Sequence, residues 1–252
     1  MREMPLEKVK TGIPGFDEII GGGFPRGYCY TIAGGPGSGK TTFAIQFLYN
    51  GATKYGENGV YLTFDESPRS IKTSALNFGM NLAKLEESRK LIIIDASPIR
   101  MEVGRYVAKA SVVLGLSNFN IDSVLKIVHE AAEKIDARRI VVDSLTSLLI
   151  QYSDPFIIRK ETLSMIRSLS EREQYTSILL SEIDEESPFR FKVEMFLTNG
   201  VIIFHNIRQA EERIRAIEVL KMRGVDHSTR LHLFKITNRG IVVYPEEKVY
   251  SR

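Results

Sequence analysis

The chain has 252 residues, of which 43% are hydrophobic, and its 34 basic and 31 acidic residues leave a formal net charge of +3. This length and apolar content suffice for one large α/β domain, so we expect residues 1–252 to form a single domain. The small net charge gives no reason to expect a chain-wide attraction to nucleic acid or to anionic lipid.

Cysteine content and hydropathy bear on the cellular compartment in which we expect the protein. Cys29 is the only cysteine, which excludes an intrachain disulfide. It falls within an apolar strand pattern, where we expect a buried packing role. No stretch of the sequence approaches the roughly 20 apolar residues that a membrane-spanning helix needs. We therefore expect a cytoplasmic protein with no membrane partner.

The first pattern along the chain lies in residues 11–23, which read TGIPGFDEIIGGG. The residues after Pro14 predict a short helix, and the three glycines at 21–23 predict where it stops. Residues 24–27 then lead into an apolar stretch. We interpret residues 1–27 as a lead-in segment rather than as a linker.

Residues 34–41 read GGPGSGKT and match the phosphate-binding pattern G-x-x-x-x-G-K-[ST] in full. The preceding residues 28–33 are aromatic and β-branched, as a strand should be. Apolar residues within 43–48 follow helical spacing. Strand, loop and helix are therefore all in the places that a nucleotide-binding loop requires.

The residue types in this loop each have a chemical reason. Glycines let the backbone wrap around an anion and point N–H groups at the α- and β-phosphates. Lys40 can reach the β- and γ-phosphates, and Thr41 can bind Mg²⁺ at the start of a helix whose positive dipole end faces the phosphates. The predicted nucleotide-binding residues are Gly34, Gly35, Pro36, Gly37, Ser38, Gly39, Lys40, Thr41 and Thr42.

After the loop, apolar strands alternate with amphipathic helices. The predicted strands are residues 60–64, 91–95, 140–143 and 177–181, and helices are predicted over 121–135 and from Asp154 onward. This alternation predicts an α/β fold with a largely parallel sheet and helices on both faces. Residues 96–120 have no clean period and fit either a lid or binding loop, or a surface excursion with some local helix.

The pattern changes near the end of the chain. Shorter strand patterns separated by polar turns follow Val201, at residues 201–205, 216–222, 231–236 and 241–244. We expect these to be antiparallel strands that extend the sheet.

Two predicted strands end in acidic residues that can complete a hydrolytic site. Residues 139–144 read RIVVDS, and the carboxyl ends of parallel strands meet at one edge, so Asp143 is expected to hold Mg²⁺ directly or through water. Asp65 and Glu66 follow the strand 60–64 and are candidates for the base that orients and deprotonates water. Each of these acids could instead cap a following helix.

The remaining polar candidates carry weaker signals. Glu182 follows the strand 177–181, and its position suggests a polar sensor of the γ-phosphate. His129, His205 and His232 are isolated from other metal-binding residue types, so we expect them to pack in the core or lie at the surface.

Five segments together resemble the KaiC-like branch of the RecA-type ATPases, in its single-domain, archaeal-type form. They read TGIPGFDEIIGGGFPRG, GGPGSGKTT, FDESP, RRIVVDS, and KMRG with a histidine after it. The match runs nearly from end to end. The resemblance implies a RecA-like P-loop NTPase core, ATP and Mg²⁺ as cofactors, and ring-shaped homo-oligomers, commonly hexamers, with ATP at the subunit interfaces.

The resemblance also assigns roles to individual residues. The family's paired catalytic acids, usually Glu-Glu, fall on Asp65 and Glu66, and the shortened first acid favours Glu66 as the base. The family's interface motif, which contacts the neighbouring subunit's nucleotide, falls on Lys221, Arg223 and His227. Lys221 and Arg223 lie two apart on a predicted strand and therefore face the same side. An arginine supplied in trans would stabilise charge on the γ-phosphoryl group.

The leading hypothesis is a Mg²⁺-dependent ATPase, and two alternatives stay open. One is an ATP-dependent assembly switch or signalling scaffold that recruits a protein partner with negligible turnover. The other is a DNA-dependent recombinase-type ATPase, against which the modest net charge stands. The family's circadian-clock member phosphorylates an adjacent Ser-Thr pair, but residues 193–200 here read VEMFLTNG, so autokinase activity is not expected.

Overall fold

The computed structural model describes residues 7–96, 121–170, 174–183, 192–209 and 211–248 of the chain. Residues 97–120, nearly all of the segment left open above, lie outside this part. The strands are β1 Lys8–Val9, β2 Phe24–Pro25, β3 Cys29–Gly34, β4 Asn58–Thr63, β5 Leu91–Asp95, β6 Ala137–Asp143, β7 Thr176–Glu182, β8 Gly200–Gln209, β9 Glu212–Met222, β10 Leu231–Thr237 and β11 Gly240–Lys248. The helices are α1 Phe16–Ile19, α2 Lys40–Asn50, α3 Pro68–Leu76, α4 Leu82–Glu87, α6 Ile121–Lys134, α7 Leu145–Leu149, α8 Pro155–Ser170 and α9 Val193–Leu197, with a π-helical turn η1 at Gly51–Tyr55.

The strands form a mixed sheet in the order β11-β10-β9-β8-β3-β7-β6-β4-β5, while β1 and β2 pair separately. The strands from β8 to β5 in this order are parallel, whereas β8 to β11 pair in antiparallel fashion. The predicted mostly parallel sheet with C-terminal antiparallel strands is confirmed. One detail differs, because β8 pairs in parallel with β3 and antiparallel with β9, and so belongs to both parts.

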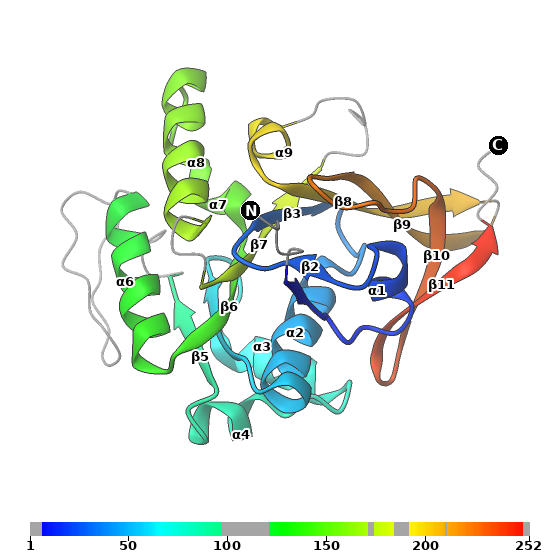
Figure 1. Cartoon of the computed structure of the whole chain (residues 1–252), viewed down its shortest axis with the longest axis horizontal. Helices are drawn as coiled ribbons and strands as arrows, with labels where there is room; N and C mark the ends of the chain where they lie inside the picture. Colours follow the sequence, from blue (N-terminus) through cyan, green and yellow to red (C-terminus); the bar gives the residue numbers. More distant parts are fainter. Residues whose placement is uncertain (1–6, 97–120, 171–173, 184–191, 210, 249–252) are drawn as a thin grey trace, which may run out of the picture.

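Helices cover both faces of the parallel strands (Figure 1). On one face α2, α3, α4 and the lead-in pack over side chains that include Tyr61 and Val141. On the other face α6, α7 and α8 pack over Val60 and Val142. Neighbouring residues of one strand thus enter opposite cores, as expected for strands that are buried on both faces. Because both faces of the sheet are packed, it holds the loops and side chains at the carboxyl ends of its strands in fixed positions.

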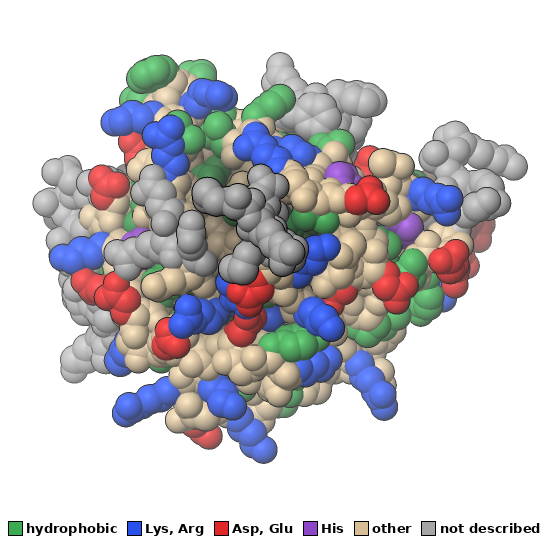
Figure 2. All heavy atoms as spheres, in the orientation of Figure 1, with side chains coloured by type: hydrophobic (Ala, Val, Ile, Leu, Met, Phe, Trp, Pro, Cys, Tyr) green, Lys and Arg blue, Asp and Glu red, His purple; other side chains and the backbone are tan. Residues whose placement is uncertain are grey.

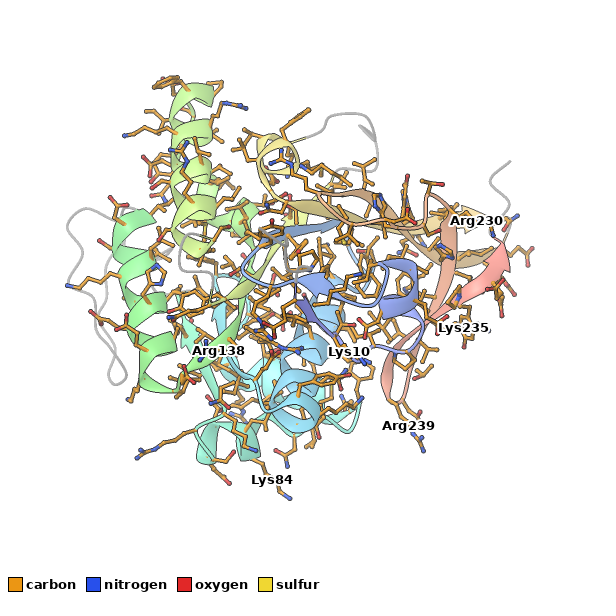
Figure 3. All side chains as sticks on the ribbon, viewed as in Figure 1. Lys10, Lys84, Arg138, Arg230, Lys235 and Arg239 are labelled. Carbon is orange, nitrogen blue, oxygen red and sulfur yellow. The ribbon has the colours of Figure 1, made fainter. Side chains whose placement is uncertain are left out.

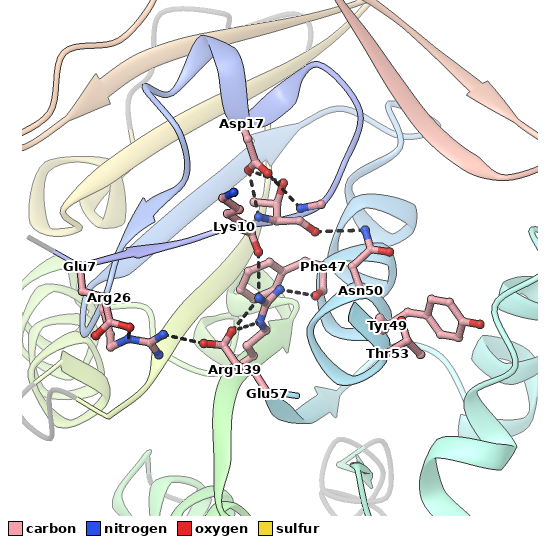
Figure 4. Close-up of polar contacts among 12 residues, drawn as sticks. Glu7, Lys10, Asp17, Arg26, Phe47, Tyr49, Asn50, Thr53, Glu57 and Arg139 are labelled. Atoms are coloured by element: carbon pink, nitrogen blue, oxygen red, sulfur yellow. Dashed lines mark hydrogen bonds and ion pairs between the residues drawn. The ribbon is translucent and has the colours of Figure 1, made fainter. Parts of the chain in front are cut away.

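A buried ion cluster joins the lead-in to the sheet at the amino ends of the strands (Figure 4). Arg139 on β6 is fully buried and donates to Glu57 Oε2 at 2.7 Å, to the Phe47 carbonyl at 2.7 Å and to the Lys10 carbonyl at 2.8 Å. Glu57 also pairs with Arg26 at 2.6 Å. Burial of a guanidinium is tolerated here because a carboxylate and two carbonyls satisfy its donors.

Hydrogen bonds to Asp17 hold the lead-in together. The Asp17 carboxylate accepts from the Thr11 N–H at 2.9 Å, from the Thr11 hydroxyl at 2.7 Å and from the Gly12 N–H at 3.1 Å. Asn50, the last residue of α2, donates to the Thr11 carbonyl at 3.0 Å. The lead-in is therefore packed against the helix that follows the phosphate loop.

The surface carries charges of both signs. Figure 2 shows basic and acidic side chains interleaved on the face that it presents. The basic side chains that Figure 3 labels are spread over helices, strands and loops, namely Lys10, Lys84, Arg138, Arg230, Lys235 and Arg239. Among the helices that the structure describes, none is both long and apolar enough to cross a bilayer.

Candidate nucleotide site

The phosphate loop joins β3 to α2, and glycine determines its shape. Gly37 and Gly39 have φ values of 68° and 100°, which favour glycine. A Cβ on Gly34 would lie 2.5 Å from the Phe204 carbonyl oxygen and 2.7 Å from Ser38 Oγ, which leaves no space for a side chain. The loop is therefore a cradle of backbone atoms.

Helix α2 begins directly after this cradle. Its N-cap residue, Gly39, makes no side-chain hydrogen bond to the helix. The first N–H groups of a helix have no partners within the helix, and the positive end of its dipole favours anions. A helix start of this kind at the end of a glycine loop matches the chemistry of a phosphate group.

Lys40 lies over the loop. Its ammonium donates to the Gly34 carbonyl at 2.8 Å and to the Gly35 carbonyl at 3.0 Å. Burial lowers the pKa of Lys40, while the negative charges of Glu182 and Asp143 act in the opposite direction. The end of β7, where Glu182 lies, is therefore electrostatically linked to the loop lysine.

Thr41 and Asp143 meet at the same edge of the sheet. The Thr41 hydroxyl donates to Asp143 Oδ2 at 3.1 Å, and the Tyr61 hydroxyl donates to the same oxygen at 2.5 Å. Burial raises the pKa of Asp143, the two hydroxyls lower it, and nearby Asp65 and Glu66 raise it again. Hydroxyl and carboxylate oxygens are the ligands that Mg²⁺ prefers, so these residues fit a magnesium site.

Tyr61 is a site residue that the sequence reasoning missed. It lies within a strand pattern that predicted only core packing, and its ring is indeed buried. Burial and the negative charge of Asp143 raise the pKa of Tyr61, so its hydroxyl stays neutral and can donate. The only signal in the sequence was a hydroxyl-bearing ring at an inward-facing strand position.

Asp65 and Glu66 follow β4 and are held in different ways. Asp65 Oδ2 accepts from the Ser147 hydroxyl at 2.5 Å and from the Ser144 hydroxyl at 3.2 Å. Glu66 Oε2 accepts from the Ser70 hydroxyl at 2.9 Å. Asp65 is thus tied to the start of α7, whereas Glu66 lies against the first turn of α3.

The alternative role of these acids as helix caps is wrong. Helix α3 is capped by Ser67, whose side chain accepts from the N–H of Ser70. Helix α7 is capped by Ser144 in the same way. The acidic side chains of the site serve neither helix as its cap.

Two residues of the interface motif, Lys221 and Arg223, contact α9. Lys221 donates to the Met195 carbonyl at 2.7 Å and Arg223 donates to the Phe196 carbonyl at 3.2 Å, so both face the same side, as predicted. Burial and the charge of Arg223 lower the pKa of Lys221 to about 8. His227 Nδ1 lies 3.1 Å from a carbonyl of its own loop. Within the described residues, the hydrogen bonds of Lys221, Arg223 and His227 do not reach the phosphate loop of the same chain.

Two further residues contact the phosphate loop without any signal in the sequence. Arg215 of β9 donates to the Gly37 carbonyl at 3.1 Å, and Asn206 of β8 donates to the Pro36 carbonyl at 3.4 Å. Both positions read as ordinary polar strand residues. Only the pairing of β8 with β3 and β9 brings them to the loop.

The histidines and the cysteine lie where the sequence predicted. His205 pairs with Glu218 at 3.0 Å, His232 is buried beside Ser228, and His129 bonds to a serine of α8 at 2.8 Å. In the part of the chain that the structure describes, no three His, Cys, Asp or Glu side chains form a metal-binding group. Cys29 is fully buried, and burial raises the pKa of its thiol, as expected for a packing residue.

Known proteins resemble this chain over most of its length. The circadian clock oscillator protein KaiC of Synechococcus elongatus is 37% identical over 241 residues, which cover 95% of this chain and 44% of that protein. The corresponding protein of Parasynechococcus marenigrum is 36% identical over 244 residues, which cover 96% of this chain and 46% of that protein. The chain thus spans somewhat less than half the length of these curated relatives.

A solved structure gives the same picture for the fold. A KaiC-like protein from the hyperthermophilic archaeon Pyrococcus horikoshii is 36% identical, with a TM-score of 0.80, and the match covers 96% of this chain and 100% of that chain. This agreement confirms the RecA-like fold. The family model described as the KaiC ATPase matches residues 9–248. The chain therefore belongs to the KaiC ATPase family.

Proposed function

We propose that this chain binds ATP together with Mg²⁺ and hydrolyses ATP to ADP and phosphate. We further infer that it works as a ring-shaped homo-oligomer, a hexamer by resemblance to its family, with the nucleotide at subunit interfaces. The proposal depends on the position of Lys40, Thr41 and Asp143, which lie together at the carboxyl ends of the strands. They lie at the start of α2, where no side chain caps the first N–H groups of the helix.

Each of these groups has a defined task. The backbone N–H groups of the phosphate loop, which Pro36 lacks, bind phosphate oxygens, and the Lys40 ammonium binds the β- and γ-phosphates. Thr41 and Asp143 would hold Mg²⁺, directly or through water. A bound Mg²⁺ neutralises charge on the β- and γ-phosphates.

Glu66 is proposed as the base that orients the attacking water and takes its proton. It has the longer side chain, and within the described residues its carboxylate accepts a hydrogen bond from Ser70. Asp65 accepts hydrogen bonds from two hydroxyls at the start of α7. We infer that these bonds fix its position, so that it is less able than Glu66 to take a proton from water. We therefore expect Glu66→Gln to abolish turnover with ATP binding retained, and Asp65→Asn to keep more activity than Glu66→Gln.

Lys221 and Arg223 are proposed to act on the nucleotide of a neighbouring subunit, accompanied by His227. In support, the two cations converge on the end of α9 rather than on their own phosphate loop. A cation in trans would stabilise charge on the γ-phosphoryl group and would make turnover depend on assembly.

One experiment tests turnover and interface together. ATP hydrolysis and molar mass are measured across a range of protein concentrations for wild type, Arg223→Ala and the control Arg138→Ala. Arg138 lies at the start of β6, away from α9 (Figure 3). Turnover per subunit should rise with assembly in wild type and in the control, and should collapse in Arg223→Ala. Nucleotide-dependent assembly without turnover would contradict the ATPase and indicate an assembly switch instead.

A further inference from the structure

Tyr61 lies on β4 with its ring buried between the sheet and α2. Its register partner on β6 is Val141, and the partner of Asp143 is Thr63. Residues two apart on a strand face the same side, so Tyr61, Val141 and Asp143 share one face of the sheet. The Tyr61 ring therefore runs alongside β6, and its hydroxyl reaches the last residue of that strand.

The hydrogen bonds to Asp143 are one-sided. Within the described residues, both side-chain donors to Asp143, the hydroxyls of Tyr61 and Thr41, bond to Oδ2, at 2.5 Å and 3.1 Å. A hydroxyl has one proton and two lone pairs, so Thr41 can donate to Asp143 and still offer a lone pair to a cation. Asp143 Oδ1 is then the carboxylate oxygen that remains for that cation.

We propose that Tyr61 is a positioning residue that fixes the Asp143 carboxylate so that Oδ1 faces the divalent cation. The inference rests on the proposed function, because it assigns how the same site prepares its metal-side ligand. Partners of this kind, which hold a ligand without touching the metal, commonly change metal affinity by 10- to 100-fold when they are removed.

Packing alone does not explain the hydroxyl. Phenylalanine would fill the same core volume, and a buried hydroxyl costs free energy unless it has a partner. Tyr30 on β3 shows the ordinary solution in the same core, because its hydroxyl donates to the Pro25 carbonyl at 2.9 Å. The Tyr61 hydroxyl bonds instead to the partly buried Asp143 carboxylate, at the edge that carries the phosphate loop.

The test compares Tyr61→Phe with the matched control Tyr30→Phe in the full chain. Mn²⁺ serves as the metal probe, and its binding is measured by electron paramagnetic resonance in the presence of a non-hydrolysable ATP analogue. Each variant loses one hydrogen bond of a buried tyrosine, so urea unfolding should show a loss of stability in both, and a larger one in Tyr61→Phe because its acceptor is charged. Tyr61→Phe should raise the Mn²⁺ dissociation constant about 10-fold, whereas Tyr30→Phe should bind Mn²⁺ as wild type does.

A second readout separates the metal from the loop. Affinity for the analogue in the presence of a chelator should be the same in wild type and in Tyr61→Phe. Unchanged Mn²⁺ binding by Tyr61→Phe overturns the inference, and so does an equal loss in Tyr30→Phe or a loss of metal-free analogue binding. If wild type binds no Mn²⁺ with the analogue, the proposed function itself fails and this inference fails with it.

Discussion

Two charged side chains, one fully buried and one partly buried, lie on the same face of β6, at opposite ends of the strand. Arg139, near its start, is surrounded by the Glu57 carboxylate and two backbone carbonyls. Asp143, at its end, accepts from two hydroxyls and has the acids Asp65 and Glu66 nearby. Helix α2 contacts both, with its first turn at Asp143 and its third at Arg139.

We assign the first charge to the stability of the fold and propose that the second serves ATP hydrolysis. Burial lowers the pKa of Arg139, but the Glu57 carboxylate and two carbonyls of the chain itself stabilise its charge, so we assign Arg139 to the stability of the fold. Burial and neighbouring acids oppose the ionised form of Asp143, and a bound divalent cation would reverse that penalty. Each charge can therefore be removed with a different expected consequence.

Removal of the buried cation should give the largest loss of stability. Arg139→Met removes one of the two arginine partners of Glu57, whose side chain is 13% exposed, and takes the donor from the Phe47 and Lys10 carbonyls. We expect a loss of about 3 to 5 kcal/mol in the free energy of unfolding. Urea unfolding at pH 7 measures it. Arg138→Met is the control, because its side chain is 40% exposed and pairs with Asp136, and should cost no more than about 0.5 kcal/mol. Equal losses in the two variants would contradict the structural role of the cluster.

Removal of the Asp143 carboxylate should have the opposite effect, with a loss of activity and no loss of stability. Asp143→Asn should lower ATP turnover by about 100-fold, because the metal-side carboxylate is lost. Its free energy of unfolding at pH 7 should stay equal or rise, since burial raises the pKa of Asp143 and its ionisation opposes folding. Turnover assays and urea unfolding on the same protein measure both. A destabilised variant with normal turnover would contradict this assignment.

The pH dependence of turnover should report Lys221, with a smaller effect. The pKa of Lys221 is lowered to about 8, so this lysine loses its proton as pH rises from 7 to 9. If its charge acts on a neighbour's nucleotide, turnover should fall by about 10-fold over this range. Lys221→Arg keeps its charge throughout and should remove this decline. The same decline in Lys221→Arg would assign it to another group.

Local signals in the sequence predicted much of the fold and the centre of the site. A few consecutive residues are enough to predict each of these features: the glycine loop, the strand before it and the acid that ends β6. The start of α8 was predicted in the same way, and the Phe156 N–H does donate to Asp154 Oδ1, at 2.7 Å. Such features depend on short-range backbone chemistry, which a single sequence displays.

The features that were missed depend on pairing between distant segments. Strand order brings Arg215 to the phosphate loop and Tyr61 to Asp143, and neither residue stands out along the chain. Arg139 read as a polar residue at a strand start until the fold placed Glu57 beside it. The sheet order that creates these contacts is not contained in hydrophobic periodicity.

The central claim is that the phosphate loop binds a nucleoside triphosphate with a divalent cation. Isothermal titration of ATP and Mg²⁺ into wild type, Lys40→Ala and the control Lys84→Ala tests it directly. Wild type and Lys84→Ala should bind one ATP per subunit with the same affinity, and Lys40→Ala should bind at least about 100-fold more weakly. Absence of heat in wild type, or equal affinity in Lys40→Ala, would contradict the account.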